Sequence, residues 1–321
     1  MRAEPRRQLI LGLTDLEHGP GLEIAPLHKP VARKPEWDVT YVDIVSTEQL
    51  REHYAHDAEV PPEDIVDVDL PLTGPDGTIR SLADVAGPGA PYAWVIASHV
   101  IEHVPDLITW LEDLAALLRD NGALVLAIPD LRYSFDIHRE QTTVGAMLQA
   151  RAQRDLTPSV RAVYDHFSSA SSITSTQAWA GTGPGRGSGR VHPRDEVDAL
   201  VEQARSGEYV DSHVWTFRPS TFVEQINELG ELGLCEFVVE RVRSTRPNQL
   251  EFFAVLRRLP RDRTPEQDEA LRAAGKHRTN DEPDRPIAPR AASITLSTRE
   301  LQLIERKRAL ARKARRVLRR R

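Results

Sequence analysis

The chain has 321 residues, of which 40% are hydrophobic, 28% charged and 6% aromatic, as expected for a globular protein of one large or two small domains. A single cysteine, Cys235, excludes a disulfide framework and a multi-cysteine zinc site. The single cysteine makes the reducing cytosol the expected compartment, and no apolar run is long enough to cross a bilayer. The net charge of −6 hides a basic C-terminal end.

The first 140 residues predict a parallel sheet. Residues 1–20 predict an arm with a short helix. From 21 to 140, strand-like apolar runs alternate with helical patterns, which is typical of strands joined by crossover helices. The strand-like runs are 21–25, 39–43, 65–70, 93–98 and 123–129. Residues 107–119 have one broad apolar face and predict a helix that ends at Asp120-Asn121-Gly122.

The remaining residues change character three times. Residues 141–218 lose the strand pattern and predict a helical and loop insertion. Residues 219–259 predict a helix that begins at Pro219 and then an antiparallel hairpin. Residues 260–292 are polar and contain prolines, which predicts a linker, and 293–321 predict a basic helical tail.

Polar side chains follow or end several of the predicted strands. Ligands bind at the carboxyl ends of the strands in an open parallel sheet, where Asp43, Asp69, Ser98 and His99 are expected. A carboxylate can accept two hydrogen bonds at once, which suits the hydroxyls of a ribose. Asp43, at the end of the second strand, is therefore a candidate ribose ligand; a capping role in the next turn is the alternative.

The most specific string follows the fourth predicted strand. It reads S-H-V-I-E-H-V-P-D at 98–106, then an amphipathic helix, then D-N-G-A-L-V-L-A-I-P-D at 120–130. This pattern resembles class I S-adenosylmethionine-dependent methyltransferases, in particular the type 11 branch. The resemblance covers about residues 20–140 and, more loosely, the hairpin. It implies a doubly wound, mostly parallel Rossmann-like α/β sheet with an antiparallel C-terminal hairpin. It also implies S-adenosylmethionine as cofactor and, as cofactor-binding residues, Glu23, Ala25, Asp43, Asp69, Ser98 and His99.

The first strand departs from the family pattern. The family usually has D/E-x-G-x-G-x-G there, whereas this chain reads Glu23-Ile24-Ala25-Pro26 with no glycine after Gly21. Ala25 stands at the first glycine position, where a methyl group costs little at negative φ and much at positive φ. Two functions remain open: an S-adenosylmethionine-dependent methyltransferase, and a non-catalytic methyltransferase-like scaffold tethered through its basic tail to a membrane or partner.

Three residues are candidate catalytic residues on the acceptor side. His103 is either a general base or a structural loop histidine. Tyr133 follows the fifth strand and either orients the acceptor or anchors its loop. His213 alternates with Trp215 and Phe217 on an extended segment, and either faces the acceptor or packs inside. The H-x-x-E-H string also resembles an inverted zinc-protease motif, but Val104-Pro105 would interrupt the helix, so we expect no metal.

The expected acceptor is a hydroxyl on a small molecule or glycan. The N/D-P-P-Y/W string of amino-group methyltransferases does not follow the fifth strand, where Ile128-Pro129-Asp130-Leu131 stands instead. In the tail, residues 300–321 are basic and carry a thin apolar stripe, which predicts peripheral contact with the inner face of the membrane; a solvated helix is the alternative. The tail has no aromatics, so we expect no nucleic-acid partner.

Overall fold

The computed structural model describes residues 3–16, 19–186 and 190–276. These residues belong to one compact unit, Met1–Arg285, so the segment boundaries predicted at 140, 218 and 259 lie within one unit and remain predictions. The predicted tail at 293–321 and residues 277–292 of the predicted linker lie outside the described residues. Among the described helices, none is both long and apolar enough to span a membrane.

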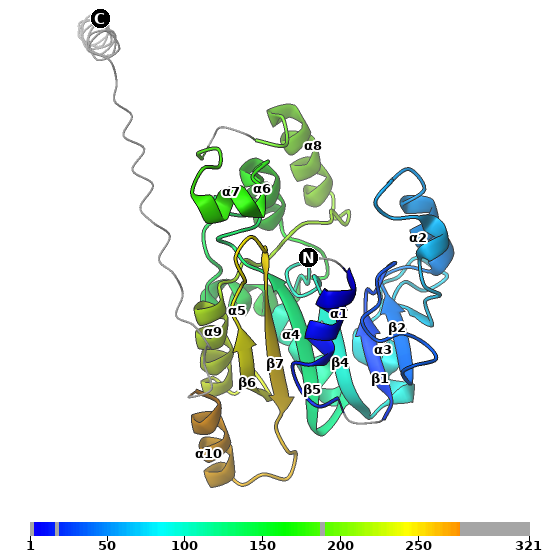
Figure 1. Ribbon diagram of the computed structural model, residues 1–321, viewed down its shortest axis with the longest axis vertical. Coiled ribbons are helices and arrows are strands. Elements are labelled where there is room, and N and C mark those ends of the chain that lie inside the picture. The colour runs from blue at the N-terminus through cyan, green and yellow to red at the C-terminus, as the bar shows by residue number, and fades with distance from the viewer. Residues whose placement is uncertain (1–2, 17–18, 187–189, 277–321) are drawn as a thin grey trace, which may run out of the picture. The chain divides into compact units, whose positions relative to one another are not determined.

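Seven strands form one sheet in the order β3-β2-β1-β4-β5-β7-β6 (Figure 1). They are β1 (Gly21–Ile24), β2 (Val39–Asp43), β3 (Leu70–Pro71), β4 (Tyr92–Ser98), β5 (Leu118–Pro129), β6 (Phe237–Arg243) and β7 (Glu251–Arg258). The first five strands pair in parallel, and β7 pairs antiparallel with β5 and β6. The predicted fold class is therefore confirmed. The strand order reverses between β1 and β4, the place where ligands bind in such sheets.

Helices and loops cover both faces of this sheet. On one face lie α3 (Leu82–Ala86), α4 (Leu107–Leu117), α5 (Val144–Gln153) and α9 (Pro219–Glu231). On the other lies α1 (Ala3–Leu11), which Figure 1 shows in front of the strands. The alternation of side chains along β4 feeds both cores, because Val95 and Ala97 point to the first face while Trp94 and Ile96 point to the second.

Further helices lie at the ends and edges of the sheet. The short helices α2 (Thr47–His53), Pro62–Asp64 and Gly87–Gly89 belong to the crossovers. The helices α6 (Val160–Ser169), α7 (Ser175–Ala180) and α8 (Arg194–Arg205) come from the insertion. They gather beyond the end of the sheet toward which β5 runs (Figure 1). The insertion thus lies on the side of the sheet where a ligand is expected.

One helix stands where a linker was predicted. Helix α10 (Pro265–Lys276) packs against β6. Arg263 pairs with Glu236 at 2.7 Å, and Arg272 pairs with Asp268 at 2.8 Å and donates to the carbonyl of Cys235. These contacts are polar, which is why the apolar pattern of the sequence did not show the helix. The prediction of a linker over 265–276 is wrong.

Two other boundaries differ from the prediction. The third strand was expected at 65–70, but only Leu70–Pro71 pairs with β2. Two earlier amides have partners outside β2: Val66 donates to the carbonyl of Leu27, and Val68 to Oγ1 of Thr47. The helix expected to reach residue 119 ends at Leu117; Asn121 is left-handed, with φ +60°, but it lies in the first part of β5 rather than at a helix cap.

Candidate functional site

The loop after β1 is held from inside the protein by Glu23. Its two carboxylate oxygens accept the backbone N–H groups of Val31 and Ala32 at 2.7 and 2.8 Å. Burial raises the pKa of Glu23 to about 7, although these two donors oppose the shift. Because both oxygens are engaged, Glu23 shapes the loop that follows β1. Its direct contact with a cofactor remains a prediction.

The same loop has the backbone of a glycine-rich turn without the glycines. Ala25 has φ +51° and Leu27 has φ +49°, both in the left-handed region. An L-residue pays about 1–2 kcal/mol for that conformation, whereas glycine does not. Ala25 also donates its N–H to the carbonyl of Val42, which fixes the loop to the end of β2. The loop therefore keeps its shape at the expense of stability.

Replacing Ala25 by glycine is expected to stabilise the protein by about 0.5–1 kcal/mol, because relief of the left-handed strain exceeds the extra entropy of the unfolded chain. Urea unfolding measures the change. Ala146→Gly in α5 is the matched control and is expected to lower the free energy of unfolding by about 1 kcal/mol, since its backbone is helical. A loss of stability in both variants would contradict the proposed strain at Ala25.

Asp43 ends β2 with a carboxylate that is only partly engaged. Within the described residues its single hydrogen-bond donor is the N–H of Ile44, which contacts Oδ1 at 2.7 Å. Burial raises the pKa of Asp43 to about 6. One oxygen is thus available at the carboxyl end of the strand, beside the point where the strand order reverses. This is the position that the ribose hypothesis requires.

Asp69 does not lie where the sequence placed it. The prediction put it at the end of the third strand, but β3 begins at Leu70, so Asp69 precedes the strand. It accepts the N–H of Tyr41 and pairs with Lys34 at 2.7 Å. The position expected for Asp69 at the end of the third strand is therefore wrong. Its described contacts fix the loop that carries Lys34.

Ser98 and His99 end β4 and are joined to distant parts of the chain. Arg6 of α1 donates to Oγ of Ser98 at 2.7 Å and to both oxygens of Glu251 in β7. His99 has φ +56°, and its Nε2 lies 3.0 Å from Glu251. Burial opposes the charged form of His99, but the carboxylates of Glu102 and Glu251 outweigh it and raise its pKa to about 9. Arg6 and Glu251 therefore contact the residues at the carboxyl end of β4, although no pattern in the sequence indicated them as site residues.

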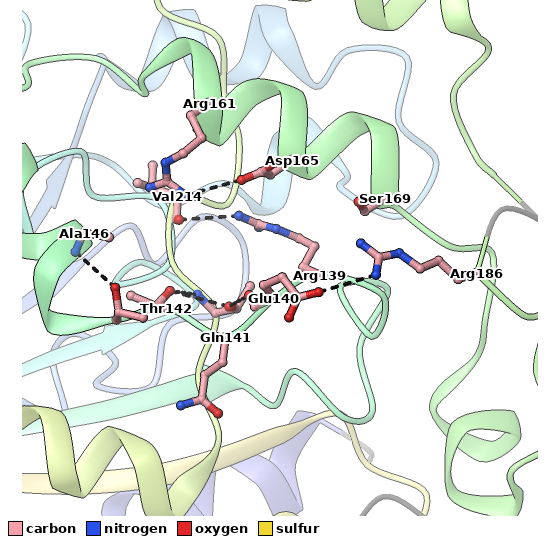
Figure 2. A pocket seen from close by; sticks show the side chains of 12 residues that line it. Arg139, Glu140, Gln141, Thr142, Ala146, Arg161, Asp165, Ser169, Arg186 and Val214 are labelled. Atoms are coloured by element: carbon pink, nitrogen blue, oxygen red, sulfur yellow. Dashed lines mark hydrogen bonds and ion pairs between the residues drawn. The ribbon is translucent and has the colours of Figure 1, made fainter. Parts of the chain in front are cut away.

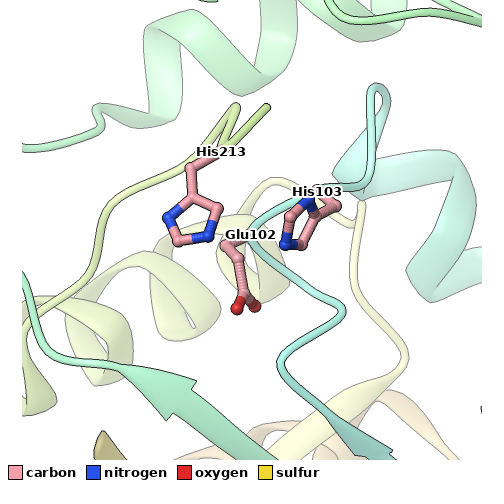
Figure 3. Close-up of side chains that lie close together, drawn as sticks. All are labelled: Glu102, His103 and His213. Atoms are coloured by element: carbon pink, nitrogen blue, oxygen red, sulfur yellow. The ribbon is translucent and has the colours of Figure 1, made fainter. Parts of the chain in front are cut away.

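His103 and His213 come together although they are far apart in the sequence. Their rings meet edge to face with centroids 4.7 Å apart, and Figure 3 shows the side chain of Glu102 below the two rings, with its carboxylate at the far end. The backbone explains this approach. Val214 and Trp215 donate their N–H groups to the carbonyl of Glu102, at 2.6 and 3.1 Å. We call Glu102, His103 and His213 the histidine cluster.

Each imidazole of the histidine cluster is oriented by a carboxylate. Nδ1 of His103 lies 2.8 Å from Asp211, and Nδ1 of His213 lies 2.5 Å from Asp136. With Nδ1–H donating to a carboxylate, Nε2 of the neutral ring carries the free lone pair. Burial opposes the charged form of His103, but Asp211 and Glu102 outweigh it and raise its pKa. Burial also favours protonation of Asp136, yet His213 and Arg139 hold its pKa at about 2.

The loop after β5 contributes an aromatic stack and a small polar pocket. Tyr133 stacks on Trp179 of α7 with ring centroids 4.0 Å apart, so the described contact fits an anchoring role; its role toward an acceptor remains a prediction. A pocket of about 240 Å³ is lined by polar side chains that include Thr142 and Asp165 (Figure 2). It adjoins the histidine cluster through Arg139, which donates to the carbonyl of His213.

The structure places several of the residues chosen from the sequence at one edge of the sheet. Asp43 and Ser98 lie at the carboxyl ends of β2 and β4, the parallel strands on either side of β1, and His99 follows Ser98. His103 and His213 share one cluster. Sequence reasoning did not select Asp136, Asp211 or Glu102 as site residues. Asp211 could have been noticed, because it stands two residues before His213 in the same polar segment.

Comparisons with known proteins were made for sequence and for structure. No curated protein matches the sequence. A solved structure from Rhodobacter sphaeroides, described as a Zn-dependent alcohol dehydrogenase, is 10% identical, with a TM-score of 0.41 and coverage of 79% of this chain and 89% of that one. An S-adenosylmethionine dependent methyltransferase from Mesorhizobium loti is 13% identical, with a TM-score of 0.38 and coverage of 80% and 98%.

A third solved structure is the 1,6-didemethyltoxoflavin-N1-methyltransferase of Burkholderia thailandensis, determined with bound S-adenosylhomocysteine. It is 13% identical, with a TM-score of 0.37 and coverage of 80% of this chain and 79% of that one. These structural likenesses are too weak to carry an assignment. The family match is different, because a model described as a methyltransferase domain matches residues 15–230, more than half of the chain. The chain belongs to this family, the class I S-adenosylmethionine-dependent methyltransferases.

Proposed function

We propose that this protein transfers a methyl group from S-adenosylmethionine to a hydroxyl of a small molecule or glycan. The observation that carries the proposal is the arrangement at the carboxyl end of the sheet. There Asp43 offers a carboxylate oxygen at the end of β2, and two carboxylate-oriented imidazoles meet, His103 from the loop after β4 and His213 from the segment before α9. In a methyltransferase of this family, the first feature would bind the methyl donor and the second would serve the methyl acceptor.

The residues at the switch point fit S-adenosylmethionine, the cofactor of the family. Asp43 would accept hydrogen bonds from the ribose hydroxyls. The loop at Ala25 has the left-handed backbone that the family normally builds with glycine, so the main chain can approach a ligand in the same way. Ser98 and His99 would lie toward its amino-acid end. When bound, the cofactor supplies an activated methyl group on a sulfonium.

The acceptor side needs little acid–base machinery. Methyl transfer depends mainly on holding donor and acceptor in contact and in line. A hydroxyl must lose its proton, and Nε2 of His103, on a ring oriented by Asp211, can accept it. The polar pocket beside Arg139 supports an acceptor that carries several hydroxyls. Two observations favour oxygen over nitrogen as the methylated atom. One is this proton acceptor, and the other is that the N/D-P-P-Y/W string of amino-group methyltransferases does not follow the fifth strand.

A non-catalytic scaffold is the second candidate function. The left-handed Ala25 and Leu27 favour it, because their side chains stand where the family keeps glycine. The engagement of Ser98 and His99 by Arg6 and Glu251 favours it as well. In that function the basic residues 300–321, which lie outside the described residues, would tether the protein to an anionic membrane surface. The two functions differ in one measurable property, the affinity for the cofactor.

Calorimetric titration of the full chain with S-adenosylmethionine and S-adenosylhomocysteine tests the proposal. We expect one site with micromolar affinity. Asp43→Ala is expected to weaken binding about 10- to 100-fold, because it removes hydrogen bonds to a charged acceptor. The matched control is Asp67→Ala, which removes an exposed carboxylate that pairs with Arg51 and is expected to leave binding unchanged.

Absence of binding heat and of thermal stabilisation at millimolar cofactor would overturn the methyltransferase proposal in favour of the scaffold. Binding that survives Asp43→Ala unchanged would keep the enzyme but refute the role given to Asp43. With binding established, a panel of hydroxyl acceptors, sugars included, identifies the substrate class.

A further inference from the structure

We propose that the histidine cluster is a binding site for one divalent transition-metal ion of the Zn²⁺ type. One donor atom of each of Glu102, His103 and His213 lies within 4.8 Å of the other two. Two imidazoles and one carboxylate form a ligand set that such ions use, with a further position left for water or substrate. This departs from the expectation of no metal drawn from the sequence.

Glu102 provides the first independent observation. The residue is 1% exposed, and neither carboxylate oxygen accepts a hydrogen bond from any described residue. Nδ1 of His99 lies 3.4 Å from Oε1, which leaves Oε2 without a close charged partner among the described contacts. A buried carboxylate without hydrogen bonds is unfavourable unless it meets an opposite charge. The His99 imidazole meets Oε1 alone, and a divalent cation between Glu102 and the two imidazoles would supply an opposite charge to Oε2 as well.

The orientation of the two imidazoles is the second observation. Metal-bound histidines commonly donate their other ring N–H to a carboxylate, which fixes the tautomer and the direction of the lone pair. His103 does so to Asp211, and His213 to Asp136. Both rings therefore present Nε2, the nitrogen that a metal would take.

His213 is also held rigidly by its backbone. Its N–H donates to Nδ1 of His166 at 2.9 Å, and its carbonyl accepts from Arg139 at 2.7 Å. Donors around a tetrahedral Zn²⁺ lie about 3.4 Å apart, so donors that now lie within 4.8 Å of one another must close by at most about 1.4 Å on binding. His103 can provide most of this movement, because it is the partly exposed member, with 29% of its side chain accessible.

A second group of possible ligands overlaps the first and is less suitable. Asp136, His166 and His213 also lie within reach of one ion. However, Asp136 already pairs with Arg139 at 3.1 Å, and its other oxygen is bound to His213. A cation there would face the buried guanidinium of Arg139, whereas the ion pair that Glu102 makes among the described residues is with the His99 imidazole, 3.4 Å from Oε1, which leaves Oε2 open. The electrostatics therefore favour the histidine cluster.

A bound ion would act as a Lewis acid toward a hydroxyl or water at its open position. Binding of the ion itself does not depend on the cofactor or on the acceptor. It is therefore measured on the protein alone, and the outcome is separate from that of the cofactor titration.

The test is titration of the untagged, chelator-treated full chain with Co²⁺, followed by visible absorption and calorimetry, with Zn²⁺ as competitor. We expect one ion per chain, a d–d absorption band, and displacement by Zn²⁺. Glu102→Gln and His213→Ala are each expected to weaken Co²⁺ binding by about 100-fold or more, and His103→Gln to do the same. His192→Ala is the control, because His192 pairs with Glu196 on α8, outside the cluster.

Circular dichroism checks that each variant is folded. If His213→Ala fails to fold, Glu102→Gln and His103→Gln still decide the matter, since they change volume little. No Co²⁺ binding at 1 mM by the folded wild-type chain would overturn the proposal. Binding that the cluster variants leave unchanged would overturn it too, because the ion would then sit elsewhere.

Discussion

Glu251→Gln is expected to lower the free energy of unfolding by about 3 kcal/mol at pH 6 and to remove a large part of the acid sensitivity of the protein. The Glu251 carboxylate accepts two N–H groups from Arg6 and lies 3.0 Å from His99. Glutamine has the shape of the protonated carboxyl but not its charge. It therefore measures what the charge contributes where α1, β4 and β7 meet.

The size and sign follow from the pKa of Glu251. Burial favours the protonated form, but His99 and Arg6 outweigh it and lower the pKa from 4.5 to about 2. A depressed carboxyl pKa stabilises the folded state fully above the ordinary value of 4.5. That stabilisation disappears as the pH falls through about 2. At pH 6 both Glu251 and His99 are charged, so the contribution is complete.

Urea unfolding of wild type and variant between pH 2 and pH 6 measures this effect. The two curves are expected to converge at low pH and to separate by about 3 kcal/mol above pH 4.5. Glu196→Gln is the control. That exposed carboxylate pairs with His192 on the surface of α8, and its loss is expected to change stability by less than about 0.5 kcal/mol. A difference between the Glu251 curves that stays constant with pH would contradict the charge-based account.

The sequence was informative wherever a local pattern reaches a strand or helix of the sheet. The continuous apolar runs of β4 and of the second half of β5, and the helix between them, were located closely, because burial on both faces of the sheet sets the pattern. The extent of the third strand was predicted wrongly, because its apolar run is buried by loop contacts rather than by strand pairing. Helix α10 was not predicted, because polar contacts through Arg263 and Arg272 hold it and leave little apolar pattern in the sequence.

The candidate site divides in the same way. Asp43 could be placed from strand order alone, because carboxyl ends of parallel strands share one edge. The histidine cluster could not. His213 reaches Glu102 only through the backbone bonds of Val214 and Trp215, which join segments more than a hundred residues apart. The H-x-x-E-H string led us to expect His99 at the cofactor and His103 on the acceptor side, and it did not indicate that His103 would meet His213.

At the histidine cluster, the general-base role and the metal-ligand role of His103 exclude each other. Both use Nε2 of His103, and both need Asp211 to orient the ring. An imidazole that binds an ion cannot take a proton, so in the metal-loaded protein the ion itself would activate the hydroxyl. The metal-free protein would rely on the imidazole.

His103→Gln is expected to lower kcat for methyl transfer by about 10²- to 10⁴-fold, the usual contribution of a positioned acid–base group. The KM for S-adenosylmethionine should stay within about twofold, because Asp43, Ser98 and His99 bind the donor in the proposed arrangement and are unchanged. Initial rates with the hydroxyl acceptor that the panel identifies measure both constants. His192→Ala is the control and is expected to leave them unaltered.

Repeating these rates after treatment with a chelator separates the two roles of the cluster. Loss of wild-type activity that Zn²⁺ or Co²⁺ restores would assign His103 as a ligand that holds the ion. Activity that survives the chelator and still falls in His103→Gln would assign the imidazole as the proton acceptor. Near wild-type kcat in His103→Gln would refute both roles. The acceptor hydroxyl would then have to be deprotonated elsewhere, and the polar pocket beside Arg139 would be the next place to look.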